Sequence, residues 1–237
     1  MRKTRRKAGA AGGSGALGRA GRGRLAPAEG GLRAVQRQVL RSFATTGRAP
    51  AASGLAGTAA RYGTTAREAL AGLHAGDFLE LGPGGDIRAA YLFSAVPTPH
   101  VVRIAGGPRV HAMCAIDALV IAAMLGTNVA ITSADPRTGE PVTVTVQAGA
   151  ETAVWRPPAA VVFYGQRTSC GPAGGGAATQ AVPPAAEVCC GYVNFFTTPA
   201  SGAAWAGACA EVTGQVLGQT TALRLGAAVF GGLLAGA

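Results

Sequence analysis

The pattern of apolar and polar residues in the first third of the chain predicts three helices. Apolar residues of the first stretch are three or four positions apart, so they share one helical face, and this pattern breaks at Gly47. A second helical stretch covers about residues 51–62. The third is capped by Thr64 or Thr65, has Glu68 placed for a capping box, and ends near Ala75. The first apolar face consists of Leu32, Val35, Val39, Leu40 and Phe43.

Two strands are expected after these helices. Residues 78–81 and 87–93 flank a tight turn of Gly, Pro and Asp residues at 82–86, which is typical of a hairpin. Three helices followed by a hairpin is the order of a winged helix-turn-helix. We therefore expect a winged-helix-like domain over residues 31–96 and a second domain over residues 97–237, with a proline-containing linker at their junction.

The second domain is expected to mix helices with mainly antiparallel strands, so the fold class is α+β. Two strands flank the turn at residues 135–139, and Gly126 ends a strongly apolar helix. A Gly/Pro-rich loop covers residues 165–184, and a loop of that length suggests a functional segment. The expected strands are 100–104, 129–133, 141–146, 161–164 and 189–196, and the expected helices are 113–125, 201–210 and about 211–225.

The net charge of +10 is concentrated at the N-terminus. Residues 1–24 hold eight Arg and Lys residues and no acid, so residues 25–237 carry a net charge of only +2. We expect residues 1–30 to form a disordered basic tail, because the segment is of low complexity and rich in Arg, Gly and Ala. The alternative is a tail that binds nucleic acid or an acidic membrane without specificity.

Neither a membrane span nor a secretory signal is predicted. The longest apolar run, residues 118–125, is far shorter than the roughly 20 residues of a spanning helix. The N-terminal charges are not followed by a continuous hydrophobic region. We therefore expect a cytoplasmic protein without a membrane partner, whose cysteines are thiols rather than a disulfide framework. These are Cys114, Cys170, Cys189, Cys190 and Cys209.

Cys114 and Asp117 are the first candidates for chemistry. They are three positions apart on the predicted helix 113–125, so both side chains lie on one face. In the first turn, the helix dipole and free N–H groups lower the pKa of a thiol, so we expect Cys114 to be a thiolate. A carboxyl group inside an apolar helix needs a partner or a function. The alternative is a buried structural cysteine and an aspartate that caps a neighbouring turn.

Cys189 and Cys190 are adjacent, and a disulfide between neighbours would strain the backbone. In an extended strand their side chains would point to opposite faces, so one could face a site and the other the core. Packing of two small residues is the alternative. The three histidines are not spaced as a zinc motif, and His111, three residues before Cys114, either tunes that thiol or packs.

Several spaced motifs resemble the alkylmercury lyase family, the organomercurial lyases of bacterial mercury resistance. Residues 111–119 resemble the family's active-site helix, residues 138–142 fit its following hairpin, and residues 189–196 resemble its second cysteine motif. Trp205 stands where the family has a Trp in the next helix. The similarity spans about residues 86–235, with Ala134 where some members carry a further cysteine.

The resemblance implies roles for individual residues. Cys114 and Cys189 match the two cysteines that attack mercury, and Asp117 matches the acid that moves the proton. Cys190 matches a neighbouring cysteine that is not thought essential. The implied reaction is protonolysis of a carbon–mercury bond, giving a hydrocarbon and Hg(II) held by Cys114, Cys189 and Asp117. No organic cofactor is implied, external cellular thiols release the product, and mercuric reductase would accept Hg(II).

The chemistry of mercury agrees with this assignment. Mercury is a soft metal that prefers thiolates to oxygen or nitrogen ligands. Two thiolates weaken the carbon–mercury bond, and a nearby carboxyl group supplies the proton that the leaving carbon needs. Binding by both sulfurs requires them to lie on the order of 4–5 Å apart, given metal–sulfur bonds of about 2.3 Å. We expect Cys114, Cys189 and Asp117 to converge on one pocket.

Two alternatives remain at this stage. A metal- or thiol-responsive DNA-binding regulator would use the winged helix, yet Arg61 and Arg67 are its only basic contacts near the third helix, and Glu68 opposes them. Several phosphate contacts are usual for DNA binding, so a nucleic-acid partner is disfavoured. The second alternative is a relative of the lyases that binds Hg(II) without turnover.

Overall fold

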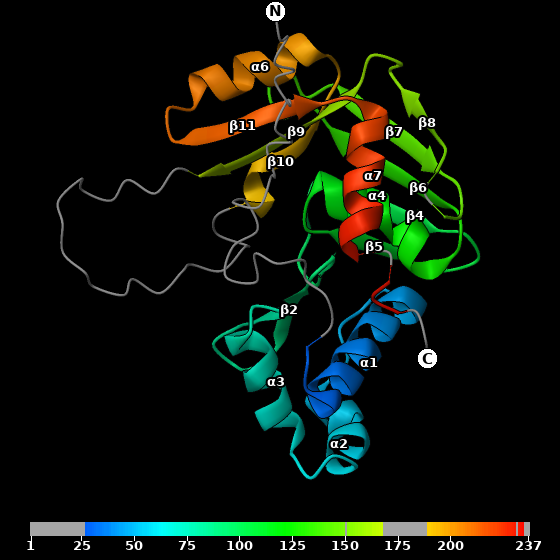
Figure 1. Ribbon diagram of the computed structural model, residues 1–237, viewed down its shortest axis with the longest axis vertical. Coiled ribbons are helices and arrows are strands. Elements are labelled where there is room, and N and C mark those ends of the chain that lie inside the picture. The colour runs from blue at the N-terminus through cyan, green and yellow to red at the C-terminus, as the bar shows by residue number, and fades with distance from the viewer. Residues whose placement is uncertain (1–26, 150, 168–188, 231, 235–237) are drawn as a thin grey trace, which may run out of the picture.

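The protein is described by a computed structural model that covers residues 27–149, 151–167, 189–230 and 232–234. Most of the expected basic tail, most of the loop expected at 165–184, and Cys170 lie outside these residues. Three helices occupy one end of the molecule, and most of the strands and the remaining helices occupy the other (Figure 1).

Three N-terminal helices form where the apolar periodicity predicts them: α1 (Gly30–Thr46), α2 (Ala52–Ala60) and α3 (Ala66–Ala75). The Glu29 side chain caps α1 by accepting hydrogen bonds from Gly31 N and Leu32 N, and Gly47 ends it with a φ of 76°. Thr65 and Glu68 form the expected capping box at α3. The buried residues of α1 include Val35, Val39, Leu40 and Phe43 of the predicted apolar face.

A large antiparallel sheet joins these helices to the rest of the molecule. Its strand order is β1-β2-β3-β5-β4-β6-β7-β8, and each neighbouring pair is antiparallel. The hairpin after α3 is therefore hydrogen-bonded into the sheet rather than separate from it. The strands are β1 (Leu79–Leu81), β2 (Ile87–Ala90), β3 (Phe93–Ser94), β4 (His100–Ile104), β5 (Arg109–Ala112), β6 (Val129–Ala134), β7 (Pro141–Val146) and β8 (Ala153–Arg156).

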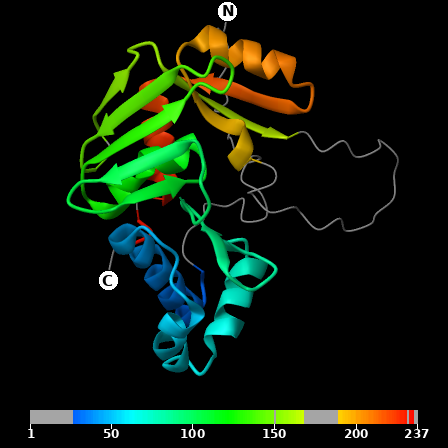
Figure 2. The ribbon, with the colours of Figure 1, turned by 180° about the vertical axis from the view of Figure 1, so that it is seen from behind.

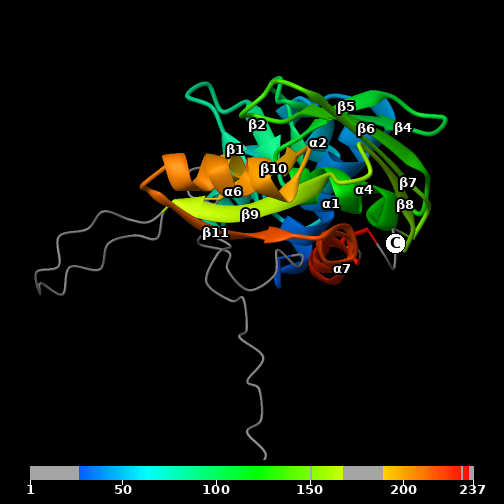
Figure 3. The same ribbon diagram turned by 90° about the horizontal axis from the view of Figure 1, so that it is seen from above.

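A second, three-stranded sheet has the order β10-β9-β11, with β9 (Val161–Arg167) between β10 (Val193–Phe196) and β11 (Val212–Leu217). Helix α6 (Pro199–Ala208) lies over this sheet (Figure 3). Alternate residues of β9 face different sides, as the period of a strand requires. Phe163 packs with Phe196 and Trp205 beneath α6, whereas Val162 belongs to the main core.

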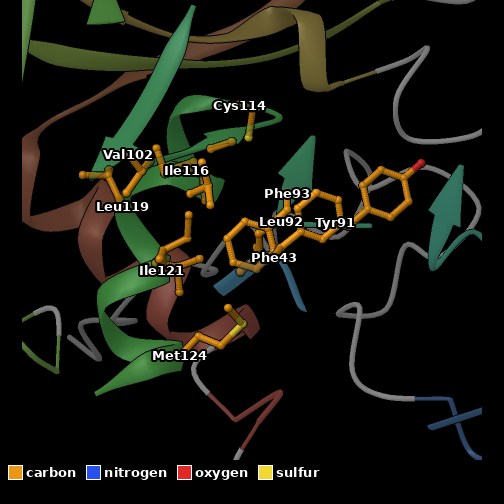
Figure 4. Close-up of a cluster of buried hydrophobic side chains, with 14 of the residues drawn as sticks. Phe43, Tyr91, Leu92, Phe93, Val102, Cys114, Ile116, Leu119, Ile121 and Met124 are labelled. Carbon is orange, nitrogen blue, oxygen red and sulfur yellow. The ribbon is translucent and has the colours of Figure 1, made fainter. Parts of the chain in front are cut away.

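The helix α4 (Ala115–Leu125) is buried along nearly its whole length. It packs on the large sheet on one side and on α7 (Gln219–Phe230) on the other (Figures 1 and 2). Its apolar side chains join the core that also contains Phe43 and Phe93, whose rings stack with centroids 5.3 Å apart (Figure 4). Close packing of α7 depends on Gly226, where an added Cβ would lie 3.2 Å from Val120 Cβ.

The observed elements differ from the sequence prediction in several places. The helix expected at 211–225 is wrong: residues 212–217 form β11, because tertiary pairing with β9 outweighs the helical pattern, and α7 begins only after Gly218. The strand expected at 87–93 is split into β2 and β3 by a turn. Strands β5 and β8 were not predicted, and both have only four residues.

The expected mixture of helices and mainly antiparallel strands is confirmed. The order of three helices and a hairpin is also present, but its assignment as a winged helix-turn-helix stays a prediction, as do the domain boundaries. One buried apolar cluster includes residues from α1 and α3 together with residues of α4 and the large sheet.

The side chain of the buried Asp135 links the β6–β7 hairpin to the end of β10 by hydrogen bonds. One carboxylate oxygen accepts hydrogen bonds from Arg137 N (2.9 Å) and Thr138 N (3.3 Å) in its own turn. The other accepts from both the N and the Oγ1 of Thr197, each at 2.9 Å. Although burial opposes ionisation, the hydrogen bonds from Thr197 and Arg137 hold the pKa of Asp135 below its usual value.

We expect Asp135→Asn to destabilise the fold by about 2–4 kcal/mol, because an amide NH2 would face donors where an oxygen now accepts. The lowered pKa means that Asp135 contributes stability above its ordinary pKa of 3.8 and loses it as the pH falls. The difference between the variant and the wild type in urea unfolding should therefore shrink below about pH 4. Glu140→Gln, an exposed charge removal in the same hairpin, is the control, and an equal loss in both variants would contradict the account.

The close contact between α4 and α7 gives a second expectation. Gly226→Leu should lower the free energy of unfolding by about 1–3 kcal/mol, because the added side chain overpacks against Val120. Gly57→Leu on the exposed face of α2 meets no atom within 4 Å at the Cβ position. It should be neutral or stabilising, since leucine favours helices more than glycine. Denaturant unfolding measures the free energy of unfolding of both variants. An unchanged value for Gly226→Leu would show that α7 does not pack against α4 as described.

Candidate functional site

Cys114 is held at the start of α4 by the strands that precede it. It is the N-cap residue of the helix, not a residue of its first turn. Met113 N donates to Leu92 O at 3.0 Å, and Thr98 Oγ1 donates to Ala112 O at 2.6 Å. These bonds tie the segment before Cys114 to the end of the hairpin and to the residues before β4. The backbone therefore fixes where the thiol points.

Asp117 lies in the first turn of α4 and has only 2% of its surface exposed. Its backbone N–H donates to Cys114 Sγ at 3.4 Å, so the thiol sulfur caps the helix. The two side chains also share a hydrogen bond. In Figure 4, Cys114 stands at the N-terminal end of α4, beyond Ile116 and Leu119. The predicted placement of Cys114 and Asp117 on one side of a helix is confirmed.

Cys189 and Cys190 lie in a tight turn, which corrects the expected strand. Cys189 precedes the 3-10 helix η2 (Cys190–Tyr192), and β10 begins only at Val193. The argument that the two side chains would point to opposite faces therefore does not apply. Both cysteines are buried, and their side chains hydrogen-bond to each other. Neither forms a disulfide, and the same holds for Cys114 and Cys209.

The two segments meet in one buried cluster of Cys114, Asp117, Cys189 and Cys190. Cys114 interacts electrostatically with Asp117 and Cys189, and Cys190 interacts with all three other members. Each of the three cysteines has only 6% of its surface exposed. The structure thus brings together the three residues that the sequence singled out, Cys114, Asp117 and Cys189, although the two segments lie far apart along the chain.

Two thiols of this cluster, Cys114 and Cys190, are held in their neutral form. Burial, followed by the negative charge of Asp117, raises the pKa of Cys114 well above its ordinary value of 9.0. The hydrogen bond to Cys189, followed by burial, raises the pKa of Cys190. The expectation that the helix dipole would make Cys114 a thiolate is therefore wrong, because loss of hydration outweighs the dipole at this buried position.

The turn that carries Cys189 is anchored through β10. The His100 side chain hydrogen-bonds to Asn194, and its Nδ1 lies 2.9 Å from Ser133 Oγ. Phe195 packs edge-on against both His100 and Trp155, each with ring centroids 5.7 Å apart. Burial lowers the pKa of His100 to about 4, so the ring is neutral near pH 7.

Sequence reasoning did not assign a role to this anchor. His100 is a single histidine on a short apolar strand, and its partners Ser133 and Asn194 lie on strands distant along the chain. No local spacing could have linked them. His111, which was considered as a residue that tunes Cys114, instead accepts a hydrogen bond from Thr98 N at 3.1 Å.

Two further observations limit the kinds of site that the described residues form. They contain no group of three or more His, Cys, Asp or Glu side chains in an arrangement that could hold a metal ion. The cysteine cluster is thus not counted among such groups. Among the same residues, no helix is long and apolar enough to cross a membrane.

The chain is similar to a curated alkylmercury lyase over part of its length. It is 33% identical over 110 residues to an alkylmercury lyase of Streptomyces lividans. That alignment covers 46% of this chain and 44% of the relative, so the chain matches less than half the length of that curated relative.

A solved structure described as the mercury-bound form of MerB2 has the same fold. The TM-score is 0.67 at 21% sequence identity, and the match covers 87% of this chain and 93% of the other. At this identity the likeness concerns the fold alone. Residues 93–231, from β3 to the end of α7, match the family described as MerB, alkylmercury lyase. Because that match covers more than half of the chain and includes both cysteine segments, the chain belongs to the alkylmercury lyase family.

Proposed function

We propose that this protein is an organomercurial lyase that cleaves carbon–mercury bonds by protonolysis, giving a hydrocarbon and Hg(II) in mercury detoxification. The observation that carries the proposal is the single buried cluster of Cys114, Asp117 and Cys189 in a member of the alkylmercury lyase family. Two thiols bind a soft metal strongly, and a carboxyl group beside them can move a proton.

The reaction starts from neutral thiols, because Cys114 keeps its proton well above neutral pH. An organomercurial R–Hg–X exchanges its ligand X for one cysteine sulfur, and the thiol proton leaves with X. The sulfur–mercury bond drives this loss, since a thiol must be deprotonated to bind a metal. The second cysteine then adds to mercury and passes its proton to the Asp117 carboxylate.

Asp117 completes the reaction by protonating carbon. The electron pair of the carbon–mercury bond goes to carbon, which takes the proton from Asp117 and leaves as R–H. Mercury remains Hg(II), bound by the two thiolates and the carboxylate of Asp117. The hydrogen bond between the side chains of Cys114 and Asp117 provides a direct path for the proton.

The proposed steps use no organic cofactor. External cellular thiols release Hg(II), and mercuric reductase is the proposed acceptor. The substrate is a small organomercurial in the cytoplasm, with no nucleic-acid or membrane partner. The N-terminal helices and hairpin form a winged-helix-like domain over residues 31–96 that supports the catalytic domain at 97–237.

No observation favours the DNA-binding regulator. Arg61 follows α2 as its C-cap residue, whereas Arg67 lies on α3, so the two basic residues are not on one recognition helix. A relative that binds Hg(II) without turnover differs from the proposed enzyme in one measurement, the release of hydrocarbon.

The direct test of the proposal compares the wild type with Asp117→Asn. Wild-type protein with an organomercurial and excess thiol should release alkane or benzene into the headspace. Asp117→Asn should still bind Hg(II) through its two cysteines, yet release hydrocarbon about 10²–10⁴-fold more slowly, because an amide cannot carry the proton.

Asp86→Asn, in the exposed β1–β2 turn, is the matched control and should behave as the wild type. Folded wild-type protein that releases no hydrocarbon would refute the proposed function. A near-normal rate in Asp117→Asn would instead assign the proton to a thiol or water.

Cys114→Ser separates the folding role of this residue from its chemistry. A serine hydroxyl is a preferred helix N-cap, so it can accept the hydrogen bond from Asp117 N that Cys114 Sγ accepts now. We expect the melting temperature to change by only a few degrees, equivalent to about 1 kcal/mol or less. Release of hydrocarbon should be lost and the affinity for Hg(II) should fall, since oxygen is a poor ligand for mercury and only Cys189 and Cys190 remain as thiols of the cluster.

Calorimetry and mercury titration measure the two effects on the same sample. If Cys114→Ser bound Hg(II) as tightly as the wild type does, Cys114 would not be a mercury ligand. A collapse of the melting temperature would show that the sulfur is needed for folding as well.

A further inference from the structure

A cleft of about 230 Å³ opens beside the buried cluster. Its lining includes Glu80, Arg88 and Ala89 of the β1–β2 hairpin, together with Met113, Cys190 and Gly191. Among the three cysteines of the cluster, Cys190 is the residue that lines this cleft, although only 6% of its surface is exposed.

Cys190 is also connected to both sulfurs that are proposed to hold Hg(II). Its side chain hydrogen-bonds to Cys189, and it interacts electrostatically with Cys114 and Asp117. Cys190 therefore contacts Cys189 of the buried pair and is also a residue of the cleft lining.

A second sulfur-containing residue lines the cleft. Met113 immediately precedes Cys114 and lines the cleft together with Cys190. Thioether and thiol sulfurs are both soft, polarisable groups that suit a soft metal. The boundary between cleft and cluster is therefore suited to passing mercury rather than a hard cation.

We propose that Cys190 is an exit ligand, through which Hg(II) passes from Cys114 and Cys189 to external thiols in the cleft. This inference rests on the proposed function, which makes Hg(II) the product held by the buried pair. A bis-thiolate complex between two buried sulfurs is poorly reached by a thiol from solvent. Cys190 is equally buried but lines the cleft, so it offers an intermediate ligand between the buried pair and an external thiol.

The exchange balances without any other reactant. Cys190 Sγ forms a bond to Hg(II), the bond from Hg(II) to Cys189 Sγ breaks, and the Cys190 proton moves to Cys189 Sγ. An external thiol in the cleft then bonds to Hg(II) and gives its proton to the cysteine that it displaces. A second external sulfur displaces the remaining cysteine in the same way, and Hg(II) leaves as a bis-thiolate. Mercury stays Hg(II) throughout, and the number of thiol protons is unchanged in the first step.

The test follows transfer of Hg(II) to a dithiol from protein loaded with one equivalent of HgCl2, by stopped-flow absorbance of the mercury–sulfur bands. Cys190→Ser should retain one bound Hg(II) but transfer it at least about tenfold more slowly, because serine is a poor mercury ligand. Cys209→Ser, a half-buried cysteine after α6, should transfer it at the wild-type rate.

A second variant leaves every sulfur in place. Gly191 lines the cleft, its φ is not in the left-handed region, and an added Cβ would meet no atom within 4 Å. Gly191→Leu should therefore narrow the cleft and also slow the transfer. Equal transfer rates in Cys190→Ser and the wild type would overturn the inference, and so would loss of bound Hg(II) in Cys190→Ser, which would make Cys190 a permanent ligand.

The two proposals fail separately. Transfer from HgCl2-loaded protein does not require cleavage of a carbon–mercury bond. If the wild type releases no hydrocarbon but its transfer of Hg(II) depends on Cys190, the lyase activity is refuted and the role of Cys190 as exit ligand is supported. If hydrocarbon release is normal but transfer of Hg(II) does not depend on Cys190, the lyase activity is supported and the exit ligand is refuted.

Discussion

The structure depends on the burial of one carboxyl group at the start of an apolar helix. Asp117 is the only charged residue of α4 and is almost completely buried. Such a group would be costly without compensation, and its position in the first turn places it at the favourable end of the helix dipole. The elements around α4 enclose it: the large sheet lies on one side, α7 on the other, and the turn with Cys189 meets its N-terminal end.

Long-range hydrogen bonds bring the second cysteine segment to this helix. Asp135 joins the β6–β7 hairpin to Thr197, just after β10, and His100 joins β4 to Asn194 within β10. These two contacts tie the segment to the large sheet, and the pairing of β10 with β9 makes it part of the small sheet. Burial in the same cluster raises the pKa of Cys114, so the packing that assembles the cluster also keeps this thiol protonated.

Local patterns predicted much of this arrangement. The capping box at Thr65 and Glu68, the turn at Gly47, and the joint placement of Cys114 and Asp117 follow from spacing alone. Features set by partners distant in sequence were missed. Residues 212–217 became a strand because β9 lies beside them, and the neutral state of Cys114 follows from burial that no local pattern reveals.

The two-residue strand β3 connects the hairpin that follows the N-terminal helices to the strand that leads to Cys114. Ala89 and Ala90 pair with it on one side, and His111 and Ala112 pair with it on the other. Leu92, immediately before β3, accepts the hydrogen bond from Met113, the neighbour of Cys114. Through β3, the hairpin that follows α3 is hydrogen-bonded to β5, the strand that leads to Cys114, even though α1–α3 contribute no side chain to the cluster.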